Sequence, residues 1–259
     1  MTTILLTNDD GIHSPGLAAL QEALSPLGNC ITVAPDRDNS AVSHSLTMKR
    51  PLLVKRLRDN VYTVDGTPTD CVALGLKKIL AHPPDLLVSG INIGANLGDD
   101  ISYSGTVSAA MEGTMYSIAS MAISIGSEPP LDFRTAIIVA HDIARRILRE
   151  GLPANTLLNI NVPAGNTTGC IRVTRQGRRL WEDSIRETLD PWGGRRYWIG
   201  GGTPVAETGY DTDVHAFESG AVSVTPIQLD LTNHDCIARL KEKWRLEKPQ
   251  PDLFTKNDL

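Results

Sequence analysis

Two adjacent carboxylates near the start of the chain have the residue types and spacing for metal chemistry. Asp9 and Asp10 follow an apolar run of strand length and precede Gly11. Neighbouring side chains of a strand point to opposite faces, so both carboxylates can face one point only after a turn, which Gly11 permits. Two such charges raise each other's pKa, and a bound cation removes that repulsion. An Asx turn with a helix cap is the alternative explanation for Asp-Asp-Gly alone.

Two further polar loops supply more oxygen donors. Residues 36–45 contain Ser40 and follow an apolar run at 30–34, and residues 90–100 contain Asn92 and follow another at 85–89. In a parallel sheet, loops after three such strands emerge at the same edge and can meet. Carboxylate, hydroxyl and amide oxygens suit magnesium, manganese or calcium rather than zinc or copper.

The glycine-rich stretch at residues 90–105 is typical of an anion-binding loop. Many of its backbone N–H groups have no side chain in the way, and Ser104, Gly105 and Thr106 stand at a predicted helix N-terminus. Such an arrangement cradles phosphate, and a hard cation beside it indicates phosphoryl chemistry. A tight structural loop is the alternative. The stretch is not the dinucleotide fingerprint, which follows the first strand.

Other polar side chains have ordinary explanations. His44 and His234 could act as a general acid or base, although a lone polar-loop histidine is more often a surface residue. Six arginines could meet a phosphate or a partner chain, but on solvated hairpins they are usually just solvated; they are residues 172, 175, 178, 179, 195 and 196. A Ser–His–Asp triad has no support, because no Gly-x-Ser-x-Gly elbow occurs.

The elements that must position these loops alternate regularly along the first part of the chain. Ser14 and Thr67 are predicted helix caps, each followed by proline at the first helical position. Strands are predicted at residues 4–7, 30–34, 49–55, 61–64, 85–89, 119–125 and 155–162, and helices at 15–25, 68–80, 107–115 and 131–149. The pattern predicts an α/β fold, a three-layer sandwich around a mostly parallel, doubly wound sheet.

After about residue 165 the regular alternation of strands and helices stops. Short β segments at 170–175, 180–185 and 195–199 predict projecting β-hairpins, followed by a returning strand at 222–226 and a C-terminal helix at 234–244. We therefore expect residues 1–164 to form a Rossmann-like core that carries the active site. Residues 165–259 are expected to elaborate the same domain and to support oligomerisation, with a mobile tail from residue 247.

Composition narrows the class of protein. The 259 residues carry 30 acidic and 25 basic side chains, a net charge of -5, which argues against DNA or RNA as a ligand. The four cysteines form no Cys-x-x-Cys pair, which favours reduced structural thiols over zinc or disulfides. No signal peptide or membrane-spanning run is evident, so we expect a cytoplasmic protein without a membrane partner.

Five blocks of this sequence together resemble the SurE family of stationary-phase survival proteins, which are metal-dependent 5′/3′-nucleotidases. They are LLTNDDG at 5–11, APDRDNS at 34–40, DGTPTDCV at 65–72, PDLLVSGIN at 84–92 continuing through Gly94, Asn96 and Gly98, and YSGTVSAA at 103–110. The resemblance is most specific over residues 4–125 and looser beyond residue 165. There it rests on SVTP at 223–226 and on the closing helix.

The resemblance implies a site and an assembly. It implies one divalent metal ion per subunit, magnesium or manganese with calcium an option in crystals, held by Asp9, Asp10, Ser40 and Asn92. It implies phosphate contacts from Asn96, Ser104, Gly105 and Thr106, with catalytic roles for Asp9, Asp10 and Asn96. It also implies a homodimer or homotetramer with exchanged C-terminal elements.

The resulting hypothesis is a phosphatase that hydrolyses nucleoside 5′- and 3′-monophosphates, and short polyphosphate, by attack of a metal-activated water on phosphorus. An aspartyl-phosphate intermediate is an alternative mechanism. The rival functions are a nucleotide-binding sensor without catalysis and an assembly protein built on the hairpins. The sequence does not distinguish the preferred base, the 5′ from the 3′ phosphate, or the physiological metal.

Overall fold

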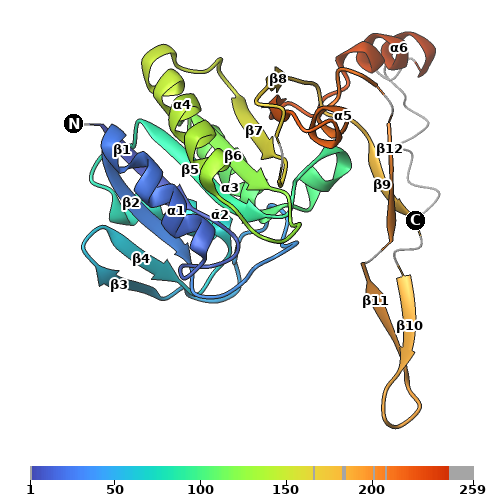
Figure 1. Cartoon of the computed structure of the whole chain (residues 1–259), viewed down its shortest axis with the longest axis horizontal. Helices are drawn as coiled ribbons and strands as arrows, with labels where there is room; N and C mark the ends of the chain where they lie inside the picture. The colour runs from blue at the N-terminus through green and yellow to red at the C-terminus, as the bar shows by residue number, and fades with distance from the viewer. Residues whose placement is uncertain (1, 166, 183–184, 201, 208, 245–259) are drawn as a thin grey trace, which may run out of the picture. The chain divides into compact units, whose positions relative to one another are not determined.

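The central element is a large mixed β-sheet, drawn with its helices in Figure 1. The structure, a computed structural model, describes residues 2–165, 167–182, 185–200, 202–207 and 209–244. Within these residues nine strands form the sheet in the order β3-β4-β2-β1-β5-β6-β7-β13-β8. Their bounds are β1 (Thr3–Thr7), β2 (Asn29–Pro35), β3 (Val54–Arg58), β4 (Val61–Val64), β5 (Leu86–Ile93), β6 (Ser120–Ile125), β7 (Thr156–Val162), β8 (Ile171–Val173) and β13 (Val222–Gln228).

Pairing in this sheet is mostly parallel. β4, β2, β1, β5, β6 and β7 run parallel to one another, while β3 pairs antiparallel with β4. β13 returns antiparallel beside β7, and β8 pairs parallel with β13. The strand order reverses around β1, with β2 on one side and β5 on the other, which is the switch point of a doubly wound sheet. The predicted fold class is confirmed.

Helices cover both faces of the sheet, as Figure 1 shows for α1 and α4 on the near face. The cluster on this face joins Ile4 and Leu6 of β1 to α1 (Pro15–Leu24) and α4 (Arg134–Glu150). The cluster on the other face joins Leu5 to α2 (Pro68–Leu74) and α3 (Gly105–Met115). Burial of one such aliphatic side chain contributes about 1.5–3 kcal/mol. A strand covered on both faces explains the continuous apolar run before Asp9.

The two predicted helix caps have different outcomes. Thr67 caps α2 in a capping box: its hydroxyl accepts from Asp70 N, and the Asp70 carboxylate accepts from Thr67 N. Ser14 precedes α1, but its hydroxyl accepts no hydrogen bond from the helix. It donates instead to Asp10 Oδ2 at 3.4 Å. Ser14 thus stands at the predicted N-cap position, with Pro15 at the first helical position, but its side chain does not make the capping hydrogen bond.

Three predicted boundaries also differ from the structure. The strand predicted at 49–55 begins only at Val54, because Pro51 lacks an N–H and Leu53 N donates to the Asp65 carboxylate instead. The helix predicted to residue 80 leaves α-geometry after Leu74 and continues as a π-helical turn, Gly75–Ile79. β5 does not end at 89, since a register shift between Gly90 and Asn92 lets it pair with β6 as far as Ile93.

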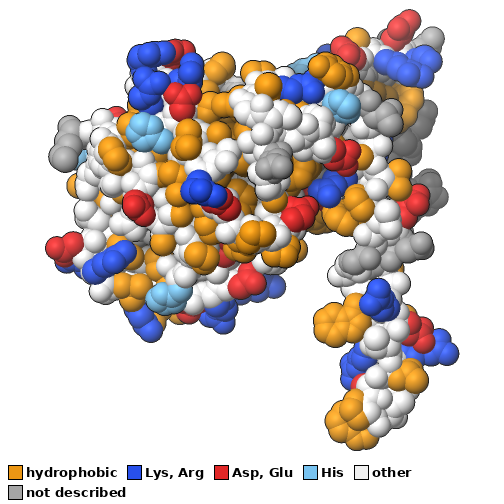
Figure 2. All heavy atoms as spheres, in the orientation of Figure 1, with side chains coloured by type: hydrophobic (Ala, Val, Ile, Leu, Met, Phe, Trp, Pro, Cys, Tyr) orange, Lys and Arg blue, Asp and Glu red, His pale blue; other side chains and the backbone are white. Residues whose placement is uncertain are grey.

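The predicted β-hairpins are present beyond the sheet. β9 (Arg179–Glu182) pairs antiparallel with β12 (Thr203–Ala206), and β10 (Ile185–Leu189) pairs antiparallel with β11 (Arg195–Ile199). Every residue of β10 and β11 is exposed, and Figure 2 shows hydrophobic side chains on this hairpin in orange. The short helix α5 (Asp213–Glu218) then leads into β13. The sequence analysis did not predict α5.

The chain divides into two compact units, residues 1–229 and residues 230–259. The described part of the second unit contains α6 (His234–Trp244), at the predicted position. The predicted mobile tail, residues 247–259, lies outside the described residues. The proposed division at residue 164 stays a prediction, although β8 and β13 beyond it complete the main sheet. Among the described helices, none is long and apolar enough to cross a membrane.

Candidate active site

The three predicted loops leave the sheet at one edge, because β2, β1 and β5 are adjacent and parallel. The turn after β1 has the predicted form: Gly11 has φ 97°, and Asn8 Nδ2 donates to Gly11 O at 3.1 Å. The second loop meets this turn where Asn39 N donates to Asp9 O at 2.8 Å. The carboxyl end of β1 is therefore a junction of loops.

Asp9 lies in contact with the start of α3. The residue is 5% exposed, and its Oδ1 accepts a hydrogen bond from the Thr106 hydroxyl. Gly105 lies equally close, since a Cβ added there would stand 2.8 Å from Asp9 Cβ and 3.0 Å from Asp9 Oδ2. The helix N-terminus and the carboxylate thus pack together without an intervening side chain.

The acidic pair is electrostatically strained without a counter-charge. Burial raises the pKa of Asp10 to about 6, and the charges of Asp9 and Asp38 add to the rise. Burial likewise raises the pKa of Asp9, against the opposing effect of its hydrogen bond from Thr106. Asp10 also lines a shallow surface depression with residues that include His13 and Arg37. A cation reaching this pair from solvent would favour the ionised form of both carboxyls.

Ser40 lies on the exposed part of the second loop. Its Oγ donates to Asp38 Oδ1 at 2.6 Å, and its N donates to the same oxygen at 2.8 Å. Asp38 is thus a third acidic side chain near the pair, which sequence reasoning did not single out. Its position two residues before Ser40 in a polar loop after a strand was the available signal.

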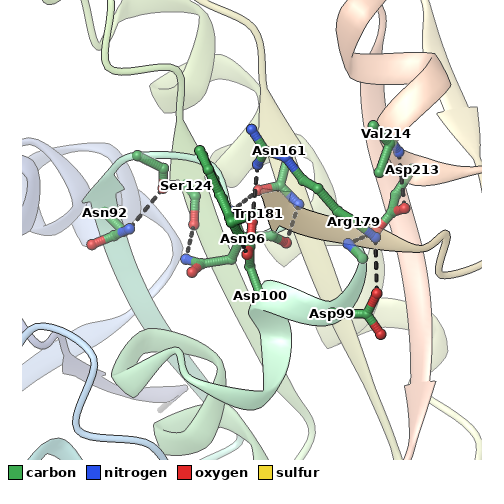
Figure 3. Close-up of polar contacts among 12 residues, drawn as sticks. Asn92, Asn96, Asp99, Asp100, Ser124, Asn161, Arg179, Trp181, Asp213 and Val214 are labelled. Atoms are coloured by element: carbon green, nitrogen blue, oxygen red, sulfur yellow. Dashed lines mark hydrogen bonds and ion pairs between the residues drawn. The ribbon is translucent and has the colours of Figure 1, made fainter. Parts of the chain in front are cut away.

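The third loop positions Asn92 and Asn96, as shown in Figure 3. Asn92 Nδ2 donates to Gly94 O at 2.7 Å, so the amide oxygen is the atom that could coordinate a cation. Asn96 is buried, and its Nδ2 donates to Ser124 Oγ at 2.8 Å. None of the contacts seen among the described residues joins either side chain directly to Asp9.

Two asparagines of β7 hold the backbone of Asn96. Asn161 Oδ1 accepts from Asn96 N at 2.7 Å, and the side-chain nitrogens of Asn159 and Asn161 donate to Asn96 O at 2.8 and 3.1 Å. Both asparagines are fully buried. Sequence reasoning missed them, although two asparagines two residues apart share one face of an otherwise apolar strand.

Ser104 caps α3, which begins two residues before the predicted start at residue 107. Ser104 Oγ accepts from Val107 N at 3.1 Å, and the helix begins at Gly105. The first N–H groups of a helix have no partner within it, so the amides of Gly105 and Thr106 are suited to an anion beside Asp9. The Thr106 hydroxyl itself is already bound to Asp9.

The remaining polar candidates have partners of their own. His44 Nε2 lies 2.8 Å from Glu112 Oε2, and His234 Nε2 lies 2.6 Å from Asp230 Oδ2 in the second unit. Each of the six arginines contacts an acidic or aromatic side chain: Arg172 with Tyr210, Arg175 with Glu207, Arg178 with Asp99, Arg179 with Asp100, Arg195 with Glu187 and Arg196 with Asp190. Because Glu112 belongs to α3, the contact with His44 anchors the second loop to that helix.

Comparison with known proteins identifies the family. The family model described as survival protein SurE matches residues 4–183 of this chain, which include all three loops. The chain belongs to the SurE family.

Individual SurE relatives match over nearly their full length. A protein of Syntrophotalea carbinolica named 5′-nucleotidase SurE is 50% identical over 94% of this chain and 99% of its own. A protein of Geobacter sulfurreducens with the same name is 47% identical over 96% of each chain. The crystal structure of the SurE protein from Aquifex aeolicus matches with a TM-score of 0.83 and 45% identity, over 95% of this chain and all of that one.

The side chains of the candidate site fit a hard divalent cation. Among the residues described, no group of three histidine, cysteine, aspartate or glutamate side chains is arranged as a metal-ligand set. The available donors are instead the two carboxylates of Asp9 and Asp10 with the neutral oxygens of Ser40 and Asn92. Such an all-oxygen set suits magnesium or manganese.

Proposed function

We propose that this chain is a metal-dependent phosphatase that hydrolyses nucleoside 5′- and 3′-monophosphates to nucleoside and phosphate. Short-chain polyphosphate is a further proposed substrate. The observation that carries the proposal is the packing of a buried carboxylate, Asp9, against the N-terminus of α3 at Gly105. A carboxylate beside an anion cradle repels a phosphate unless a cation lies between them. The names of the SurE relatives support the nucleotidase class.

The proposed metal ligands are Asp9, Asp10, Ser40 and Asn92, with one magnesium or manganese ion per subunit. A bound divalent cation supplies a Lewis acid for phosphoryl oxygens and lowers the pKa of coordinated water. Each ligand has a structural support: Thr106 holds Asp9, Ser14 contacts Asp10, Asp38 holds Ser40 and Gly94 holds Asn92. The supports of Asp9 and Asn92 orient their oxygens before a ligand arrives, whereas the exposed contact of Ser40 leaves its loop free to adjust.

The proposed phosphate contacts come from the third loop and the start of α3. The N–H groups of Gly105 and Thr106 would donate to phosphoryl oxygens, and the absence of a side chain at Gly105 allows close approach to the backbone. Ser104 and Asn96 would add side-chain donors. A donor that strengthens its bond as negative charge grows on these oxygens is worth roughly 2–4 kcal/mol by analogy with an oxyanion hole.

The proposed assembly is a homodimer or homotetramer with exchanged C-terminal elements. The β10–β11 hairpin supports it, because Trp198 is 67% and Ile199 87% exposed on strands with no buried residue. Light scattering on wild-type protein and on Trp198→Ser would test it. A monomeric wild type would exclude this assembly.

The deciding experiment is phosphate release from a panel of nucleoside 5′- and 3′-monophosphates with Mn²⁺, with Mg²⁺ and with EDTA. Release that needs either metal and stops with EDTA is the expected result, and the same panel ranks base and phosphate position. Tight metal-dependent nucleotide binding without release would favour the sensor. Recovery of a phosphorylated aspartate from quenched reactions would favour covalent catalysis over attack by water.

A further inference from the structure

The segment Gly98–Ser102 joins the two halves of the proposed phosphate site, since Asn96 precedes it and Ser104 follows it. It is one short 3-10 helix, and several of its polar groups also bond to residues of the C-terminal part of the first unit, between residues 176 and 213. Figure 3 shows Arg179, Trp181 and Asp213 converging on this segment.

Asp213 makes the central contact. Its side chain is fully buried at the start of α5, where Oδ2 accepts from Gly98 N at 2.9 Å. Its other oxygen accepts from Gly177 N and Val214 N, both at 2.8 Å. Three backbone donors satisfy this buried carboxylate, and two of them come from segments that the chain separates widely. One side chain thus joins the proposed site, the base of the hairpins and α5.

Further contacts surround the same peptide. Gln176 Nε2 donates to Gly98 O at 2.9 Å, so both polar groups of Gly98 are bonded to this C-terminal region. Arg179 N donates to Asp99 Oδ2 at 2.8 Å, while the Arg179 and Trp181 side chains donate to the Asp100 carboxylate at 2.9 and 2.7 Å.

The backbones also touch directly at this point. Gly98 has φ 53°, and a Cβ added there would lie 3.0 Å from Arg179 N and Cβ. Both polar groups of the Gly98 peptide are bonded, and the backbone of Arg179 fills the space beside its Cα. Close packing of this kind fixes the position of the segment. A shift of β9 or α5 would therefore move the chain between Asn96 and Ser104.

We propose that Asp213 and Gln176 are positioning residues for phosphate binding: through Gly98 they set the loop that presents Asn96 and Ser104. The base of the hairpins is then part of the active-site support as well as a surface element. The proposal rests on the phosphatase function only for its kinetic readout. Misplacing a positioned group by about 1 Å can cost about 10²-fold in rate.

The test compares Asp213→Asn with wild type and with a matched control, Asp190→Asn. The amide keeps the shape of Asp213 but turns one acceptor oxygen into a donor that faces backbone N–H groups. Asp190 likewise accepts from two backbone donors, Trp192 N at 3.0 Å and Gly194 N at 2.8 Å, but in the turn of the β10–β11 hairpin. The control therefore makes the same chemical change without touching Gly98.

We expect Asp213→Asn to lower kcat about 10- to 100-fold and to weaken inhibition by inorganic phosphate about tenfold. Mn²⁺ affinity, measured calorimetrically without nucleotide, should stay within about twofold of wild type, because the proposed metal ligands lie on other segments. Asp190→Asn should leave all three quantities unchanged. A merely structural role for Asp213 would weaken Mn²⁺ and phosphate binding alike.

A second variant, Gln176→Met, decides the question if Asp213→Asn does not fold. It removes only the donor to Gly98 O. We therefore expect kcat to fall and phosphate inhibition to weaken by about two- to tenfold each, with Mn²⁺ affinity unchanged. Normal kcat and phosphate inhibition in every folded variant would overturn the proposal. If wild type released no phosphate at all, the proposed function would fail, while calorimetric binding of inorganic phosphate would still test the positioning role.

Discussion

The loop that carries Ser40 and the loop that carries Asn96 are built differently. Around Ser40 itself the side-chain hydrogen bonds are short-range and exposed: Ser40 bonds to Asp38, and Asn39 Nδ2 bonds to Arg37 O. The long-range contacts of this loop come from Asn39 N, which donates to Asp9 O, and from His44 at its end, which pairs with Glu112. Near Asn96 the contacts are buried and long-range. Asn96 bonds to residues 63 and 65 positions away, and Gly98 bonds to Asp213, 115 positions away.

This difference indicates a division of labour in the proposed site. A buried, fully bonded loop keeps its donors in place before a ligand arrives, which is the condition for electrostatic stabilisation of a transition state. An exposed loop with local contacts opens at lower cost. We therefore expect the Asn96 loop to be preformed and the Ser40 loop to adjust around the cation. Asp9 touches both regions, through Asn39 N and through Thr106.

The largest expected effect comes from Asp9→Ala, because Asp9 contacts both regions. Loss of a ligand and of the contact to α3 should lower phosphate release by at least about 10²-fold, the upper range for removing even an outer-shell support of a metal site. Circular dichroism should report a folded protein. The matched control is Asp85→Ala, whose carboxylate bonds Thr3 N at the opposite end of β1. Near-normal turnover of Asp9→Ala would refute the metal assignment.

A smaller loss is expected from Asn161→Leu, which affects the buried loop alone. Leucine has a similar size but offers Asn96 neither an acceptor nor a donor. Asn96 O keeps its hydrogen bond from Asn159, but Asn96 N is left unpaired, which should cost about 1–3 kcal/mol in stability. We expect kcat to fall about 10- to 100-fold with metal affinity retained. Denaturant unfolding and steady-state kinetics would check both effects, and an unchanged kcat would show that the loop needs no such support.

Ser40→Ala should act differently, because its loop is exposed. Losing one neutral oxygen ligand should weaken Mn²⁺ affinity about tenfold and leave kcat at saturating metal within about threefold. Titrating activity against Mn²⁺ separates the two quantities. A fall in kcat that excess metal does not restore would mean that this loop is as rigidly required as the Asn96 loop, which would break the comparison.

The smallest expected effect is on stability and depends on pH. In metal-free protein the folded-state pKa of Asp10 is about 6, above its ordinary value of 3.8, so the folded state binds protons more readily than the unfolded chain. Its destabilising effect is absent below about pH 4 and complete above about pH 6. Mg²⁺ should therefore raise Tm more at pH 7.5 than at pH 5.0, by about 2–4 °C per kcal/mol of added stability. Equal increments at both pH values would contradict this prediction.

Sequence reasoning reached the features that depend on local patterns. Alternating apolar runs and turn residues predicted the doubly wound sheet, and Thr67 followed by Pro68 predicted the start of α2. The same reasoning placed Ser14 correctly before α1 but did not predict its hydrogen bond, which goes to Asp10 and not to the helix. Local patterns therefore predicted the position of this residue better than the partner of its side chain.

The residues that hold the Asn96 loop could not be predicted from local patterns, because they lie far from it in the sequence. Asn159, Asn161 and Asp213 act on it from strands and helices far along the chain, and no spacing rule connects residues 98 and 213. The alternation of Asn159 and Asn161 could have indicated a buried polar face of β7. That this face bonds to the backbone of Asn96 could be known only once the order of the strands in the sheet was known.

The hydrogen bond from Gly98 to Asp213 also bears on the order of synthesis. At about 5–20 residues per second, the ribosome needs roughly 6–23 s to make the 115 residues between them. During that interval the nascent chain already contains Asp9, Asp10 and Ser40 but not the carboxylate that holds the Asn96 loop. The acidic pair is therefore expected to form early during translation, and the complete site only when almost the whole chain has been made.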